Sequence, residues 1–218
     1  MTMMHDDFRS KLEAALQAHE PHRMTLEDAH DAAVLIPVVA EPEPTLLFTL
    51  RTENVSSHKG QIAFPGGRID PPDASIAAAA LRENHEELGI EPGAVEVIGE
   101  LDSFPTFVSG YVVTPVVGWL AREPRITPNP SEVAEVLHVP IAELVEDIRS
   151  EAGFTHADRT YPTEAWVWND HVIWGVTARI LRSFLGRLAQ AGLALPPGKT
   201  SSWTAWPIQD QPVRDHAS

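Results

Sequence analysis

The sequence contains no cysteine. A chain without thiols forms no disulfides, zinc-thiolate sites or iron–sulfur clusters, and it has no cysteine nucleophile. Basic residues are also scarce, with 16 Lys and Arg against 31 Asp and Glu and a formal net charge of −15. Nucleic acids and anionic membranes attract basic surfaces, so we expect neither as a partner. An anionic substrate would have to be held locally, by a few arginines or a metal ion.

Long apolar runs are missing as well. The longest, residues 32–40, spans nine residues and includes Pro37, whereas a membrane-spanning helix needs about 20. Residues 1–24 mix charged and single apolar side chains and lack the apolar stretch of a secretion signal. These absences predict a soluble, cytoplasmic protein.

What the sequence does contain fits one domain of ordinary size followed by a tail. Apolar spacing and turn residues predict helices over about residues 6–18, 73–88, 141–149 and 175–191, and strands over 32–40, 45–51, 95–101, 111–120, 135–139, 165–168 and 171–173. Strands and helices do not alternate regularly, which favours an α+β or a layered α/β/α domain. We place the domain at residues 1–191 and an extended tail, rich in Pro, Gly, Ser and Thr, at 192–218.

The helix predicted over residues 73–88 carries the sequence Arg82-Glu83-Asn84-His85-Glu86-Glu87. Residues three and four apart share a helix face, so Glu83, Glu86 and Glu87 bring three carboxylates together. Such like charges repel by roughly a few tenths of a kcal/mol per pair, and a hard divalent cation removes that repulsion. The alternative is a solvated acidic face with Arg82 as an ion-pair partner.

A glycine pair precedes this acidic helix, in Phe64-Pro65-Gly66-Gly67-Arg68. Paired glycines let a backbone approach a phosphate or a metal closely. Together, the Gly-Gly loop and the Arg-Glu-x-x-Glu-Glu-x-Gly helix resemble the box of the Nudix hydrolases. The resemblance implies a Nudix-type α/β/α sandwich with a mixed β-sheet.

The match to the family pattern departs at three points. Asp73 stands where the family has Glu, eight residues rather than seven separate it from Arg82, and Asn84 occupies a hydrophobic position. The first two departures are similar to the coenzyme A pyrophosphatase branch. A buried amide needs partners, since leaving it unpaired costs roughly 1–3 kcal/mol. We expect Asn84 to bond to the Gly-Gly loop.

Segments outside the box also resemble the coenzyme A pyrophosphatase branch. Residues 47–52, with Val55, His58 and Gly60, are similar to the motif that precedes the box in that branch. Residues 174–181 are similar to its C-terminal helix, and residues 99–118 and 132–136 with Val139-Pro140 also fit. The resemblance covers roughly residues 32–188.

The resemblance implies metal-assisted hydrolysis of a nucleoside diphosphate linked to another group. Mg²⁺ (or Mn²⁺) would be held by Glu83, Glu86 and Glu87 and by the backbone carbonyl of Gly67, with Glu86 acting either directly or through water. Arg82 would hold a glutamate in its rotamer.

The base that activates water is either a glutamate of the box or one from a later loop, where Glu132 and Glu135 are the candidates. Arg51 and Arg68 suit anion binding by the geometry of the guanidinium group. His58 is a third candidate for contact with substrate phosphate. Glu132 and Glu135 have an alternative interpretation as surface charges, His58 as a solvated loop residue, and Arg51 as part of a structural ion pair.

The substrate implied by the resemblance is coenzyme A or an acyl-CoA, cleaved to 3′,5′-ADP and (acyl-)4′-phosphopantetheine. ADP-ribose or a dinucleotide such as NADH is the alternative within enzymes. A non-catalytic Nudix-like sensor is a more distant one, because such modules usually lose box carboxylates and this chain keeps all three. Trp203 and Trp206 in the tail predict packing against the same chain or contact with a second subunit of a homodimer.

Overall fold

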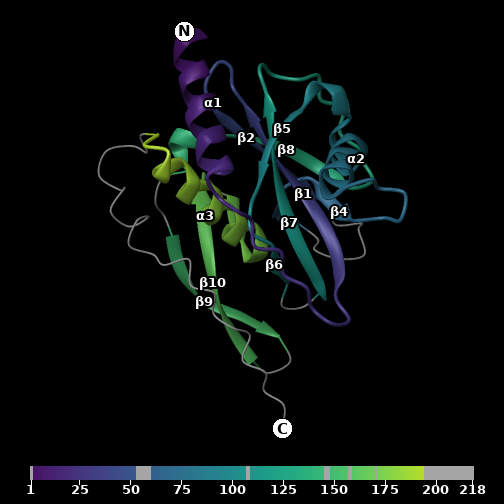
Figure 1. Ribbon diagram of the computed structural model, residues 1–218. Coiled ribbons are helices and arrows are strands. Elements are labelled where there is room, and N and C mark those ends of the chain that lie inside the picture. Colours follow the sequence, from purple (N-terminus) through teal and green to yellow (C-terminus); the bar gives the residue numbers. More distant parts are fainter. Residues whose placement is uncertain are drawn as a thin grey trace.

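The computed structural model describes residues 2–52, 60–106, 109–144, 148–156, 159–169 and 171–193. Three helices and eleven strands occur in this part of the chain (Figure 1). They are α1 (Thr2–Gln17), β1 (His30–Val39), β2 (Thr45–Arg51), β3 (Ile62–Ala63), β4 (Gly66–Arg68), α2 (Ile76–Leu88), β5 (Glu96–Glu100), β6 (Phe104–Pro105), β7 (Tyr111–Leu120), β8 (Val133–Pro140), β9 (Ile148–His156), β10 (Arg159–Trp168), β11 (His171–Trp174) and α3 (Gly175–Gln190).

The main sheet is mixed, and β1 lies at its centre. β1 runs parallel to β7 over its whole length, from His30 opposite Tyr111 to Val39 opposite Leu120. Its pairings with β2 and β4 are antiparallel, as are those of β7 with β5 and β6. Both long strands are almost continuously apolar and buried, as expected for strands covered on both faces.

The sheet splits between β1 and β2, and this split positions the glycine loop. The two strands pair only near their connecting turn, at Val38–Leu46 and Val39–Thr45. Beyond that point β3 pairs with β2 and β4 pairs with β1. Pro65, between β3 and β4, accepts a hydrogen bond from the Leu35 backbone N–H at 2.8 Å. The Gly-Gly segment is thereby fixed to the central strand.

Helices cover both faces of the sheet, which confirms the predicted α/β/α sandwich (Figure 1). On one face, α2 packs its apolar residues against β1, β2 and β7, in a cluster that includes Ala80, Leu88, Ala33 and Val116. On the other face, α1 and α3 lie side by side over a larger core. The faces are called here the α2 face and the α1/α3 face.

One predicted helix is wrong. Residues 141–149 were expected to be helical, but the structure has a short 3₁₀ turn at Ile141–Glu143 and then β9, which starts at Ile148. Ile148 and Arg149 pair with Trp166 and Ala165 of β10. Antiparallel pairing to a distant segment therefore overrides the local helical spacing.

The other predicted helices and strands are present, but β10 begins at Arg159 rather than at residue 165, and β4, β6 and β9 were not predicted. The hairpin around Asn169 is confirmed, with Trp168 opposite His171 and Asn169 at a φ of 51°. The residues of the tail from 194 onward lie outside the described part, so their packing and the 191/192 boundary stay predictions. Within the described residues, no helix has the length and apolar character that a membrane crossing requires.

Candidate active site

Helix α2 holds the box glutamates, and local signals set both of its ends. The Ser75 side chain accepts a hydrogen bond from the Ala78 N–H at 3.0 Å, so the helix starts at Ile76 rather than at residue 73. Gly89 ends it with a φ of 67° and donates its N–H to the His85 carbonyl at 2.8 Å. The acidic residues lie in the last two turns.

Arg82 connects α2 to the segment that precedes it. Its Nε and Nη2 donate to the two oxygens of Asp73 at 2.9 and 3.0 Å, and Nη2 also donates to the Arg68 carbonyl at 3.0 Å. Nη1 donates to Glu83 Oε1 at 2.8 Å. The hydrogen bonds from Arg82 hold the pKa of Asp73 below its usual value. Asp73, although shorter than the family's Glu, thus makes a two-point contact with Arg82.

Gly67 lies directly against the Glu83 carboxylate. A Cβ added at Gly67 would be 2.6 Å from Glu83 Oε1 and 2.7 Å from Oε2. Only glycine leaves that space, so the backbone of β4 and the carboxylate of α2 are in close contact. Burial raises the pKa of Glu83, an effect that the Arg82 hydrogen bond opposes.

Glu87 is the most deeply buried box glutamate, with a side chain only 2% exposed. Its Oε1 accepts a hydrogen bond from Arg51 Nη1 at 3.1 Å, while its Oε2 has no hydrogen-bond partner among the described residues. Burial raises the pKa of Glu87 to about 7, against the opposing charge of Arg51. Glu86, in contrast, is 53% exposed and lies 3.5 Å from Arg82 Nη1.

The loop before β8 brings Glu132 to the same place. The Asn129 N–H donates to the Glu87 carbonyl at 2.9 Å, which fastens this loop to the end of α2. Asn129 Nδ2 donates to Glu132 Oε1 at 3.3 Å. The negative charge of Glu132 contributes to the raised pKa values of both Glu83 and Glu87. Glu132 therefore lies close to the two buried box carboxylates.

Two predicted residues project from the opposite side of the sheet. Glu135 pairs directly with Leu50, and Leu50 packs into the core on the α1/α3 face. Arg68 pairs with Ala32, which belongs to the same core. Directly paired residues share a face, so neither side chain starts from the α2 face. His58 lies outside the described residues.

The structure adds one residue that the sequence did not indicate and corrects the expectation for another. Asn129 belongs to no recognised motif, and its role as the link between Glu87 and Glu132 depends on the folded loop. Asn84 is completely buried, yet neither of its amide atoms has a hydrogen-bond partner within the described part of the chain. The expected bond from Asn84 to the Gly-Gly loop is therefore not observed.

The donor set suits a hard divalent cation. Glu83, Glu86 and Glu87 offer carboxylate oxygens, the ligands that Mg²⁺ and Mn²⁺ prefer. The buried Oε2 of Glu87, which has no hydrogen-bond partner among the described residues, and the contact between the Glu83 carboxylate and the Gly67 backbone fit such a cation site. Among the described residues, no three His, Asp or Glu side chains lie close enough together to form a metal-binding group as they stand.

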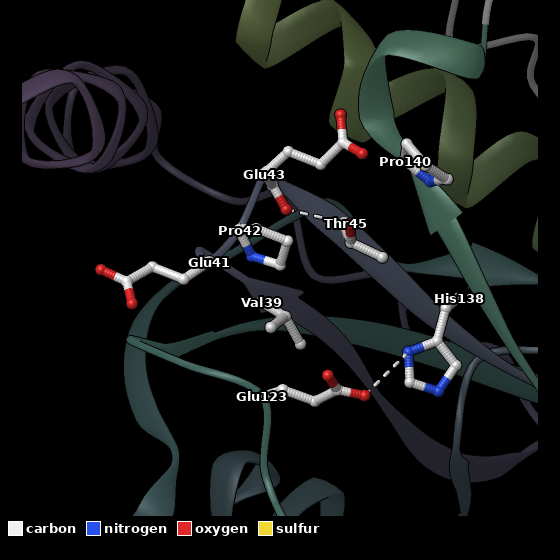
Figure 2. A pocket seen from close by; sticks show the side chains of 8 residues that line it. All are labelled: Val39, Glu41, Pro42, Glu43, Thr45, Glu123, His138 and Pro140. Carbon is white, nitrogen blue, oxygen red and sulfur yellow. Dashed lines mark hydrogen bonds and ion pairs between the residues drawn. The ribbon is translucent and has the colours of Figure 1, made fainter. Parts of the chain in front are cut away.

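A pocket of about 200 Å³ lies elsewhere, beside the β1–β2 turn (Figure 2). In Figure 2, Glu123 and His138 face one another across it, with 3.6 Å between Oε1 and Nδ1. Thr45, in its lining, is six residues along β2 from Arg51, a separation of about 20 Å at the rise of a strand. The pocket includes none of the predicted site residues and is separate from the box.

Comparisons with known proteins agree on one family. The model of the NUDIX domain matches residues 29–162. An uncharacterized Nudix hydrolase NudL of Photorhabdus laumondii is 40% identical over 173 residues, which cover 76% of this chain and 89% of the relative. A protein of the same description from Shigella sonnei is 40% identical over 192 residues, covering 83% and 93%.

Solved structures share the fold. A MutT/nudix family protein from Enterococcus faecalis superposes with a TM-score of 0.52 at 13% identity, covering 87% of this chain and 74% of that one. At such low identity the likeness concerns the arrangement of helices and strands alone.

Proposed function

This chain belongs to the Nudix hydrolase family, and from that premise we propose that it hydrolyses the diphosphate of coenzyme A or acyl-CoA. The products are 3′,5′-ADP and 4′-phosphopantetheine or its acylated form. The family accounts for hydrolysis of nucleoside diphosphate derivatives. The choice of coenzyme A rests on the sequence motifs outside the box.

The observation that supports this choice most directly is the ion pair between Arg51 and Glu87. Arg51 belongs to the segment that resembles the coenzyme A pyrophosphatase motif, and Glu87 belongs to the Nudix box. The two motifs are thus parts of one site. An arginine at this place supplies a cationic group for a phosphate next to the reacting diphosphate.

We assign Glu83, Glu86, Glu87 and the Gly67 carbonyl as the groups that hold Mg²⁺ or Mn²⁺. The cation, when bound, neutralises charge on the diphosphate and lowers the pKa of a coordinated water. Arg82 keeps Glu83 in place through its bonds to Asp73 and the Arg68 carbonyl. The buried position of Glu87 shields its carboxylate from bulk solvent.

Glu132 is our choice for the residue that accepts a proton from the attacking water. It is half-buried, lies near Glu83 and Glu87, and is positioned by Asn129. Glu135, the other loop candidate, starts from the α1/α3 face. A carboxylate on the wrong side of the sheet is poorly placed to reach a water near the box.

The test is an analysis of products after incubation with coenzyme A, NADH and ADP-ribose, each with Mg²⁺ and with Mn²⁺. We expect 3′,5′-ADP and 4′-phosphopantetheine from coenzyme A, and no products after the metal is chelated. Glu87→Gln serves as the control for contaminating hydrolases. Faster release of AMP from ADP-ribose or NADH than of 3′,5′-ADP from coenzyme A would instead establish the alternative substrates.

A further inference from the structure

Asn84 is a polar residue at the centre of the buried face of α2. Ala80, one turn before it, and Leu88, one turn after it, both pack in the apolar core of the α2 face. Asn84 itself is 0% exposed, and its Oδ1 and Nδ2 have no partner among the described residues. Buried polar atoms of folded proteins are nearly always hydrogen-bonded, to protein groups or to ordered water. This amide therefore needs partners.

Glu87 and Arg51, near Asn84, also have buried polar atoms without a hydrogen-bond partner among the described residues. Glu87 is three residues further on, so its side chain lies next to that of Asn84 on the helix surface. Glu87 Oε2 is buried without a partner, and so is Nε of Arg51, whose Nη1 binds Glu87 Oε1. Four unpartnered buried atoms thus belong to three residues that helix spacing and one ion pair bring together.

The chemistry of these four atoms is complementary. Arg51 Nε and Asn84 Nδ2 are donors, whereas Glu87 Oε2 and Asn84 Oδ1 are acceptors. A water molecule donates two hydrogen bonds and accepts two, and buried waters typically make about three bonds to such groups. Ordered water between the three side chains would satisfy all of the groups that the protein leaves unpaired.

We propose that Asn84 is a positioning residue, which joins Glu87 Oε2 and Arg51 Nε through buried water and so holds the Glu87 carboxylate in the orientation that binds metal. The proposal depends on the proposed role of Glu87 as a metal ligand, but not on the identity of the substrate. A residue that only filled space in the core would have no such link to metal affinity, and a hydrophobic side chain would fill that space better.

Three substitutions separate positioning from packing. The alanine and serine side chains introduced by Asn84→Ala and Asn84→Ser are similar in size, but only the serine hydroxyl can hydrogen-bond to water. Asn84→Leu introduces a hydrophobic residue, as in the family pattern, and removes the buried amide. The measurements are the Kd of Mn²⁺, obtained by titration of the purified full-length protein without substrate, and the Tm of the metal-free protein.

We expect Mn²⁺ to bind about 10-fold more weakly to Asn84→Ala and Asn84→Leu, the range seen when partners of metal ligands are removed. Asn84→Ser should stay within about threefold of the unmodified protein, and Asn84→Leu should raise the Tm even as it weakens Mn²⁺ binding. Mn²⁺ affinities within twofold of one another in all variants would overturn the proposal and leave Asn84 a packing residue.

A crystal structure gives an independent test. Water within hydrogen-bond distance of both Asn84 and Glu87 would support the network, and direct bonds of both amide atoms to other protein groups would refute it. A wrong choice of substrate can be distinguished from a wrong positioning role for Asn84. A protein that binds Mn²⁺ in an Asn84-dependent way but does not cleave coenzyme A would contradict the proposed substrate and leave the positioning role in place.

Discussion

Arg51 and Glu87, 36 positions apart in the sequence, form an ion pair with 3.1 Å between Nη1 and Oε1. The pair joins the end of β2 to the buried side of α2. The Glu87 side chain is only 2% exposed. The positive charge of Arg51 partly offsets the effect of burial on the Glu87 carboxylate. A bound metal ion would add a second positive charge beside the same carboxylate.

Replacement of Glu87 by Gln should reduce kcat on the order of 10²-fold or more and weaken Mn²⁺ binding, since the amide keeps the shape but loses the charge. The fold should remain intact, because a neutral side chain is easier to bury than a charged one. Steady-state kinetics, Mn²⁺ titration and thermal unfolding check this. Unchanged turnover would remove Glu87 from the site.

Glu132→Gln and Glu135→Gln make a matched pair, because both remove one negative charge within four residues of the same segment. We expect Glu132→Gln to lower kcat at least about tenfold, as loss of a general base does, and Glu135→Gln to stay within about twofold. The comparison is made on kcat with saturating substrate and Mg²⁺. If neither variant is slower by tenfold, the base must be a glutamate of the box.

Alanine substitutions at the two glycines of the loop should affect stability and activity differently. In Gly66→Ala the new Cβ would meet the Ala33 carbonyl oxygen at 2.4 Å, a backbone atom that cannot yield, so stability should fall by about 2 kcal/mol or more. In Gly67→Ala it would meet the end of the Glu83 side chain, which can move.

Gly67→Ala should therefore lose little stability, while its kcat falls about tenfold or more as Glu83 is displaced. Denaturant unfolding and kinetics on both variants give the comparison. Equal losses of stability in the two variants would contradict the contact described for Gly67.

The stability of the metal-free protein should decrease between about pH 4.5 and 7. Burial raises the pKa of Glu87 from 4.5 to about 7, so in this window the folded state keeps a proton that the unfolded chain releases. The free energy of unfolding then falls as pH rises, by up to about 3 kcal/mol for this group. Urea unfolding at several pH values measures it, and Glu87→Gln should flatten the slope. A slope equal in both proteins would assign the effect to other groups.

Removal of residues 192–218 should lower stability or assembly more than chemistry. Leu193 packs against the core on the α1/α3 face, so its loss exposes apolar surface, and Trp203 and Trp206 are lost with it. We expect kcat per folded site to stay within a few-fold. The Tm, the oligomeric state by light scattering and the kinetics are compared with the full chain. A large drop in kcat of a truncated protein that is still folded and assembled would show that the tail reaches the substrate.

Local features of the sequence were enough to predict the box. The spacing of Glu83, Glu86 and Glu87 sets one helix face whatever the rest of the chain does, because the helical period is a property of the local backbone. Gly89 as the helix end and Asn169 in a hairpin turn are likewise local signals. The α/β/α arrangement followed from the family resemblance that these residues carry.

Contacts between distant segments could not be obtained in this way. The apolar spacing at residues 141–149 predicted a helix, but pairing of Ile148 with Trp166 made it a strand. Glu132 and Glu135 looked equivalent in the sequence. The register of β8 against β2, with its irregularity next to Arg51, put Glu135 on the far face and left Glu132 near the box. A shift of one residue in register exchanges the faces of a strand, and only the assembled sheet fixes that register.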